Sequence, residues 1–167
     1  MADEEPVKSI DILILGLGQS LRGDDGAGLE AVRLWQETYP ETAKMVNVVL
    51  AELPGLGLLD LLDGMEAAIL VDAVHGSAAA GTLHHIRPEK LDSFTPGSAS
   101  AHGWGVAETL ELGRSLYPEL GNYRISLIGI EAGSMDMGAG LSPQVQAALP
   151  EAVKLIEKEV QGLLLLK

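Results

Sequence analysis

The stretch Ala67-Ala68-Ile69-Leu70-Val71-Asp72-Ala73-Val74 decides the fold of this chain. Its aliphatic residues do not alternate with polar ones, and such a continuous apolar run predicts a strand that is buried on both faces. Strands of this kind lie at the centre of parallel sheets that helices cover on both sides. We therefore expect an α/β domain around this stretch.

Other apolar, β-branched runs predict four more strands, and amphipathic spacing predicts the helices between them. The strands are expected at residues 10–15, 45–51, 82–87 and 123–130. Helices are expected at residues 29–39, 56–62, 103–117 and 151–161, the last after a helix start at Ser142-Pro143, with Ser142 as its cap, and a break at Pro150. This alternation predicts a three-layer αβα domain with a mostly parallel, twisted five-stranded sheet and helices on both faces.

One strand of this sheet is expected to run against the others. Only seven residues, 75–81, separate the strand at 82–87 from the central strand, too few for a helical crossover, so it should be antiparallel to its neighbour. No linker or repeat divides the chain, and residues 1–167 are interpreted as a single α/β domain. In the flavodoxin-like order 2-1-3-4-5, the first and third strands are neighbours and the ligand crevice lies between their carboxyl ends.

Composition excludes several classes of partner and site. The 167 residues carry 24 acidic side chains against 11 Lys and Arg, a net charge of −13, so nucleic acid and anionic membranes are not expected partners. The absence of cysteine excludes disulfides, an all-thiolate zinc site and a thiol nucleophile. The acidic N-terminal residues do not resemble a signal peptide, and no apolar run reaches the roughly 18 residues of a membrane span. A cytoplasmic protein is expected.

The turn after the first strand, Gly16-Leu17-Gly18-Gln19-Ser20-Leu21-Arg22-Gly23-Asp24-Asp25-Gly26-Ala27-Gly28, is the first candidate site. A dinucleotide fingerprint requires glycine where Leu21 stands, and no Gly-Lys-Ser/Thr of a P-loop occurs. The turn instead brings two carboxylates, Asp24 and Asp25, to the end of the sheet. Helix capping is the structural alternative, although a single cap requires only one aspartate.

Asp72 and His102 are the other candidates. Asp72 lies near the end of the central strand, where a buried carboxylate is costly unless it is paired, hydrogen-bonded or bound to a metal. His102 lies in a loop of small residues before a helix and is alternatively a capping or solvent-exposed histidine. His84 and His85 are consecutive on a strand, so they point to opposite faces and cannot chelate one ion together.

Asp25, Asp72 and His102 occupy three junctions that this fold can bring to one edge of the sheet. Two carboxylates and an imidazole suit a divalent transition metal with open positions, which would polarise a carbonyl or activate water. The two carboxylates alone are an alternative, sharing a proton as acid and base. No G-x-S-x-G motif supports serine chemistry.

This arrangement resembles the hydrogenase maturation endopeptidases, which trim the C-terminal extension from the large subunit of nickel-iron hydrogenases. The resemblance rests on Gly16-Leu17-Gly18-Gln19, on Gly23-Asp24-Asp25-Gly26-Ala27-Gly28, on Val71-Asp72-Ala73-Val74 and on Ser100-Ala101-His102-Gly103, in the family's order. Weaker similarity lies at Leu127-Ile128-Gly129-Ile130-Glu131 and Leu141-Ser142-Pro143. One departure is Gln19, where the family commonly has Asn.

The resemblance implies the function as well as the α/β fold. It implies that Asp25, Asp72 and His102 are the metal ligands, with Asp24 beside them, and that the nickel is carried by the precursor rather than resident in the protease. Asp25 or Asp72 is then expected to activate water, as in an aspartyl protease, and the hydrogenase large-subunit precursor is the expected partner. The alternative is a non-catalytic metal- or nucleotide-binding α/β module, such as a nickel chaperone. The oligomeric state is not determined by the sequence, and a monomer is compatible with it.

Overall fold

The computed structural model describes residues 10–52, 55–91 and 106–166. These ranges contain a five-stranded sheet with the strand order β2-β1-β3-β5-β4. The strands are β1 (Ile12–Gly18), β2 (Asn47–Glu52), β3 (Ala67–Val74), β4 (Leu83–Ile86) and β5 (Arg124–Glu131). The pairs β1–β2, β1–β3 and β3–β5 are parallel, and β4 is antiparallel to β5.

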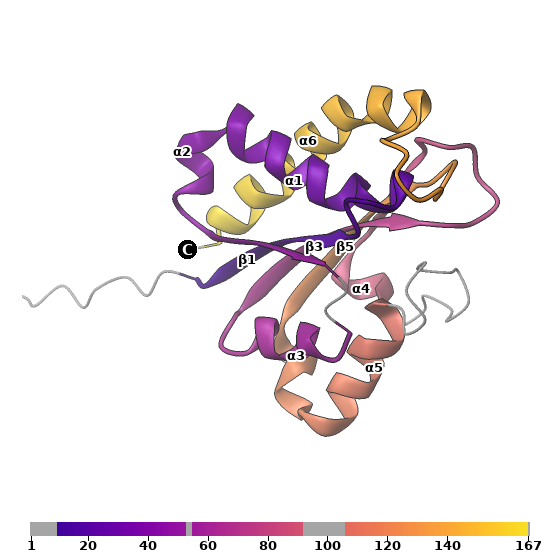
Figure 1. Ribbon diagram of the computed structural model, residues 1–167. Coiled ribbons are helices and arrows are strands. Elements are labelled where there is room, and N and C mark those ends of the chain that lie inside the picture. The colour runs from indigo at the N-terminus through magenta and orange to yellow at the C-terminus, as the bar shows by residue number, and fades with distance from the viewer. Residues whose placement is uncertain (1–9, 53–54, 92–105, 167) are drawn as a thin grey trace, which may run out of the picture.

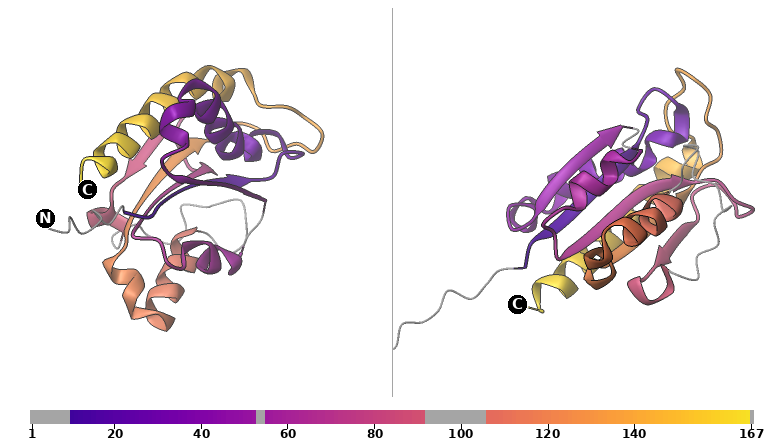
Figure 2. Two further views of the ribbon diagram at one scale, coloured as in Figure 1. Left: turned by 90° about the vertical axis from the view of Figure 1, so that its left-hand side faces the viewer. Right: turned by 90° about the horizontal axis from the view of Figure 1, so that it is seen from below.

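Helices cover both faces of the sheet (Figure 1). They are α1 (Ala27–Thr38), α2 (Pro40–Ala43), α3 (Gly57–Leu62), α4 (Pro88–Leu91), α5 (Val106–Leu116) and α6 (Pro143–Leu164), with two 3₁₀ turns, η1 (Gly23–Gly26) and η2 (Pro118–Asn122). Helices α1 and α6 pack on one face, and α3 and α5 on the other, as the two further views in Figure 2 confirm. The predicted three-layer αβα domain is confirmed. No helix among the described residues is both long and apolar enough to cross a bilayer.

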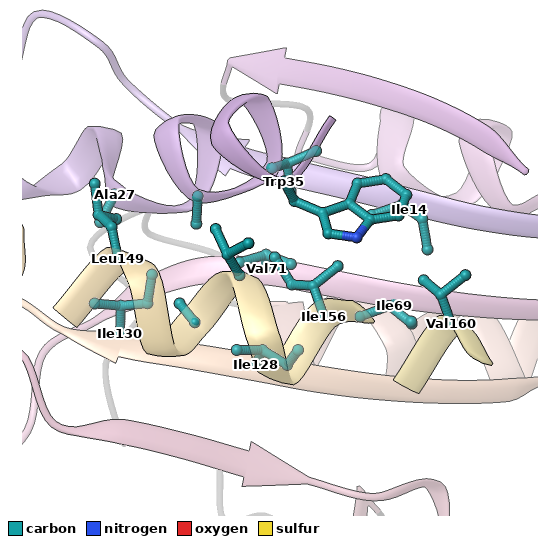
Figure 3. Packing of buried hydrophobic residues seen from close by; sticks show 14 of the residues in the cluster. Ile14, Ala27, Trp35, Ile69, Val71, Ile128, Ile130, Leu149, Ile156 and Val160 are labelled. Atoms are coloured by element: carbon teal, nitrogen blue, oxygen red, sulfur yellow. The ribbon is translucent and has the colours of Figure 1, made fainter. Parts of the chain in front are cut away.

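Side chains of the central strands alternate between two hydrophobic clusters. Ile14, Ile69 and Ile128 face α1 and α6 and pack with Trp35, which is completely buried (Figure 3). The neighbouring residues of the same strands face α3 and α5; this second cluster includes Leu15, Leu70, Leu127, Leu58 and Leu110. Both faces of β3 are therefore buried, as its unbroken apolar sequence predicts.

The position of β4 differs from the sequence-based expectation. It is antiparallel, as predicted, but its neighbour is β5, which is inserted between β3 and β4. The order is thus 2-1-3-5-4, not the flavodoxin-like 2-1-3-4-5. This arrangement places β3 between two parallel strands and leaves the short antiparallel strand at the edge. The neighbouring positions of β1 and β3, which define the expected crevice, are as anticipated.

Helix α6 continues through Pro150, so the expected break at this residue is wrong. Proline removes one backbone N–H, and the side chain of Pro150 lies on the exposed side of the helix, where water can solvate the freed carbonyl. Val145, Leu149, Val153 and Ile156 form a buried stripe that packs on the sheet across this position. Tertiary packing of that stripe outweighs the local cost of the proline.

Candidate functional site at the carboxyl ends of β1 and β3

The glycine-rich turn after β1 brings the start of α1 very close to the sheet. A Cβ on Gly28 would lie 2.2 Å from the carbonyl oxygen of Val71 and 2.5 Å from that of Leu17, so only glycine fits there. This close approach places η1 against β3. Asp25 lies in η1 and is completely buried.

The other aspartate of η1, Asp24, is an anchor for the loop between β5 and α6. Its Oδ2 accepts hydrogen bonds from the backbone N–H groups of Gly133 (2.8 Å) and Ser134 (2.9 Å) and from the hydroxyl of Ser142 (2.8 Å). Its Oδ1 accepts a bond from the Ser142 N–H at 2.6 Å. The Asp24 N–H in turn donates to the Ser134 carbonyl at 2.7 Å. Two segments far apart in the sequence are thereby joined at one carboxylate.

These contacts exclude the capping alternative for Asp24 and revise the prediction that Ser142 caps α6. Asp24 caps neither η1 nor α1, because neither has a side-chain cap hydrogen bond. Ser142 precedes α6, as predicted, but its hydroxyl donates to Asp24 instead of capping the helix. Burial by itself raises the pKa of the Asp24 carboxyl, but the hydrogen bonds from Ser134, Ser142 and Gly133 together outweigh it and hold the pKa below its usual 3.8. Asp24 is therefore ionised in the folded protein at neutral pH.

Asp72 lies in β3, one residue beyond the carbonyl of Val71 that α1 approaches. Its side chain is only 2% exposed. Because Leu70 faces the cluster beneath α3 and α5, alternation puts the Asp72 side chain on that same face of the sheet. The fold thus brings both predicted carboxylates, Asp25 and Asp72, to the carboxyl ends of β1 and β3, where ligands bind in open α/β sheets.

The third predicted ligand, His102, lies outside the described residues, as does the start of the helix expected at 103–117. Within the described ranges no group of three or more His, Cys, Asp or Glu side chains is arranged to hold a metal ion. The predicted set of two carboxylates and one imidazole therefore stays a prediction. Carboxylate oxygens and imidazole nitrogen are ligands that suit divalent transition metals, so the chemistry of the donors fits such an ion.

A second contact fixes the other side of the glycine-rich turn. Glu52, the last residue of β2, accepts hydrogen bonds from both the hydroxyl and the backbone N–H of Ser20 through Oε1. The Ser20 hydroxyl, and then its N–H, hold the pKa of the Glu52 carboxyl below the usual 4.5. The neighbouring Gln19 donates its backbone N–H to the Asp25 carbonyl at 3.3 Å. The turn that carries Asp25 is thus held by β2 on one side and by the β5–α6 loop on the other.

The strand histidines point to opposite faces, as their adjacency predicts. His84 Nε2 lies 2.8 Å from Oε2 of Glu131, and His85 Nε2 lies 3.2 Å from Oε2 of Glu159 in α6. Glu131, which ends β5, is only 2% exposed, and its buried carboxylate was not among the predicted site residues. Its signal in the sequence is similar to that of Asp72: an acidic residue at or near the end of a run of buried aliphatic side chains.

Comparison with known proteins identifies the family. The profile of the family described as "HycI: Hydrogenase maturation protease" matches residues 30–159. The chain belongs to this family. It is accordingly a peptidase of the hydrogenase maturation type, and the resemblance noted in its sequence motifs is confirmed. The matched range includes Asp72 and the position of His102, whereas Asp25 precedes it.

Individual relatives support the assignment of this protease. The NiFe hydrogenase maturation protease HybD from Thermococcus kodakarensis has a similar structure, with 32% identity, a TM-score of 0.74 and coverage of 90% of this chain and 99% of that one. The hydrogenase expression/formation protein HupD of Rhizobium leguminosarum bv. viciae is 29% identical over 86% of this chain and 70% of its own length. The hydrogenase maturating endopeptidase HybD from Escherichia coli has the same fold, with a TM-score of 0.75, 24% identity and coverage of 92% of this chain and 93% of its own.

Proposed function

We propose that this protease acts in the cytoplasm to remove the C-terminal extension of a nickel-iron hydrogenase large-subunit precursor after nickel insertion. The observation that carries the proposal is the pair of buried carboxylates, Asp25 and Asp72, at the carboxyl ends of two neighbouring strands in a member of the maturation protease family. Both groups sit where this architecture binds ligands. The acidic net charge of −13 is consistent with a protein substrate and not with nucleic acid.

In this proposal nickel is part of the substrate. Asp25, Asp72 and His102 would contact a nickel ion that the precursor already holds, supplying two oxygens and one nitrogen and leaving the remaining positions to the precursor's own ligands. Contacts to the nickel would make the protease bind the loaded precursor more tightly than the empty one. The protease would then process the loaded form in preference to the empty form. Cleavage would thereby follow metal insertion.

The same two carboxylates would carry the hydrolysis. One of them, Asp25 or Asp72, takes a proton from the attacking water while the water oxygen bonds to the scissile carbonyl carbon. As the C–N bond breaks, that proton passes to the leaving amide nitrogen, which departs as the amine of the released extension. Burial favours this role, because electrostatic interactions between a carboxylate and the charge that develops during the reaction are stronger where water is excluded.

The direct test is intact-mass spectrometry of a hydrogenase large-subunit precursor from the same organism after incubation with the protease. We expect loss of the C-terminal extension from the nickel-loaded precursor and no loss from the nickel-free form. Loss from both forms would retain the peptidase and overturn the dependence on nickel. Tight binding and release of free nickel without cleavage would instead favour the nickel chaperone.

Site variants make the same experiment specific. Asp25→Asn, Asp72→Asn and His102→Ala should each abolish processing, while circular dichroism and thermal unfolding show a folded protein. Asp60→Asn is the matched control, since Asp60 is an exposed aspartate on α3. Normal processing by all three site variants would overturn the assignment of the site.

A further inference from the structure

A cavity of about 520 Å³ opens beside the candidate site, at the edge of the sheet formed by β4. It is bounded by the last residue of β3, by the loop that follows it, by β4 and by the end of β5. The residues that form its walls and matter here are Val74, Ala78, Leu83, Ile86, Gly129 and Glu131. The contact between His84 and Glu131 described above forms part of its wall.

The cavity lies on the same face of the sheet as Asp72. In the register of the sheet, Asp72 is opposite Gly129, and Gly129 is opposite His84, so the three form one row across β3, β5 and β4. The middle member of the row has no side chain, and a Cβ at Gly129 would lie 2.8 Å from Cγ1 of Val74. Glycine at this position gives the Val74 side chain room to pack over the row, and Val74 in turn lines the cavity.

Glu131 gives the cavity a fixed wall. Its Oε1 accepts a hydrogen bond from the backbone N–H of Gly76, and its Oε2 bonds to Nε2 of His84 at 2.8 Å. Both carboxylate oxygens therefore serve to hold the loop after β3 and the side chain of His84. Because the protein itself supplies these donors, the remaining wall on this face of the sheet is largely aliphatic, made by Val74, Ala78 and Ile86, with His75 and Ser77 beside them.

We infer that this cavity is a specificity pocket that receives an apolar side chain of the precursor, next to the bond that the protease cuts. The inference rests on the proposed function, since it assigns the occupant to the same substrate. Its volume exceeds that of a single side chain, so it accommodates the side chain together with adjoining backbone of an extended peptide. Burial of apolar surface against the aliphatic walls would favour such a residue over a polar one.

The test introduces a large side chain into the pocket at an exposed residue, outside the hydrophobic core. Ala78 is exposed and lines the cavity, whereas the next residue, Ala79, is exposed and does not. We would compare the wild type with Ala78→Trp and Ala79→Trp by measuring kcat/KM on the nickel-loaded precursor. Precursor variants would carry single alanine substitutions at each apolar residue that flanks the cut. Ser77→Trp, at another exposed lining residue, is a second filling variant should Ala78→Trp fail to fold.

For the wild type and Ala79→Trp, alanine at one of these precursor positions should lower kcat/KM by about tenfold, the scale of discrimination that an apolar pocket provides. Ala78→Trp or Ser77→Trp should process the unaltered precursor about tenfold less efficiently, and should no longer distinguish it from that alanine variant. Efficient processing by the filling variants, with the preference unchanged, would overturn the pocket assignment alone. Failure of the wild type to cut the loaded precursor would overturn the proposed function and this inference together.

Discussion

Asp24 and Ser142 are 118 residues apart in the chain, yet the carboxylate of the first accepts both the N–H and the hydroxyl of the second, at 2.6 and 2.8 Å. The start of helix α6 is therefore hydrogen-bonded to the same short turn that carries Asp25. The two adjacent aspartates have different surroundings: one is fully engaged in holding the β5–α6 loop, and the other lies against β3 at the end of the sheet. Of these two, Asp25 is the one assigned to the proposed chemistry.

Removal of the Asp24 carboxylate should strongly destabilise the fold. Asp24→Ala leaves the N–H groups of Gly133, Ser134 and Ser142 without their acceptor in a partly buried position, which costs on the order of 3 kcal/mol of unfolding free energy. Urea unfolding followed by circular dichroism measures the loss. Asp136→Ala, at an exposed aspartate of the same loop, is the control and should change stability far less. Equal stability of the two variants would contradict the anchoring role.

The same carboxylate should make the fold sensitive to acid. The pKa of Asp24 is lower in the folded protein than the roughly 3.9 of an unfolded chain, so its ionised form stabilises the folded state. That stabilisation is complete above the unfolded pKa and is lost as the pH falls through the lower, folded pKa. The difference between the urea midpoints of the wild type and Asp24→Asn should therefore be largest near pH 6, begin to shrink below about pH 3.9, and vanish below the folded pKa of Asp24. A constant difference across this range would disprove the linkage.

A methyl group at Gly28 should prevent the close approach of α1 to the sheet. The added Cβ would meet carbonyl oxygens of both β1 and β3 at 2.5 Å or less, and backbone atoms cannot move aside as a flexible side chain does. Gly28→Ala is expected to give little soluble, folded protein. Gly162→Ala in α6 is the matched control: its Cβ would meet open space, and it should stabilise the helix by roughly 0.5–1 kcal/mol. Thermal unfolding of the purified variants compares the two.

Replacement of Pro150 by alanine should stabilise the protein. The substitution restores a backbone N–H to the exposed side of α6, which we expect to add about 1–2 kcal/mol, because the gain in helix propensity is partly offset by a more flexible unfolded chain. The exposed neighbour Glu151 provides the comparison, since Glu151→Ala should stay within about 0.5 kcal/mol of the wild type. A lower unfolding temperature for Pro150→Ala would contradict this expectation.

The parts of the fold that depend on local pattern could be predicted from the sequence. The bounds of β3 agree residue for residue, because an uninterrupted aliphatic run signals a strand buried on both faces. The break expected at Pro150 did not occur, since the buried stripe of α6 packs against the sheet on either side of it. The insertion of β5 beside β3 was not predictable either, because strand pairing is decided between segments that are far apart in the chain.

In the candidate site, too, features set by the local sequence could be predicted, and features set by distant segments could not. An acidic pair after a strand and an aspartate within an apolar run identified Asp25 and Asp72 as carboxylates at the end of the sheet, and the fold places them there. The separate role of Asp24 was hidden, because its partners at 133–142 lie more than 100 positions away and are mostly backbone N–H groups. Backbone donors leave no residue type to recognise in the sequence.

The joint between Asp24 and the start of α6 also bears on the timing of biosynthesis. The ribosome makes the turn that carries Asp25 more than 100 residues before Gly133, Ser134 and Ser142, the residues that fix this turn. A nascent chain that has emerged only as far as β5 contains Asp25 and Asp72. It still lacks the hydrogen-bond donors that fix the turn after β1. Because contacts so distant in sequence form only when both segments are available, the turn that carries Asp25 is fixed only after the β5–α6 loop has been synthesised.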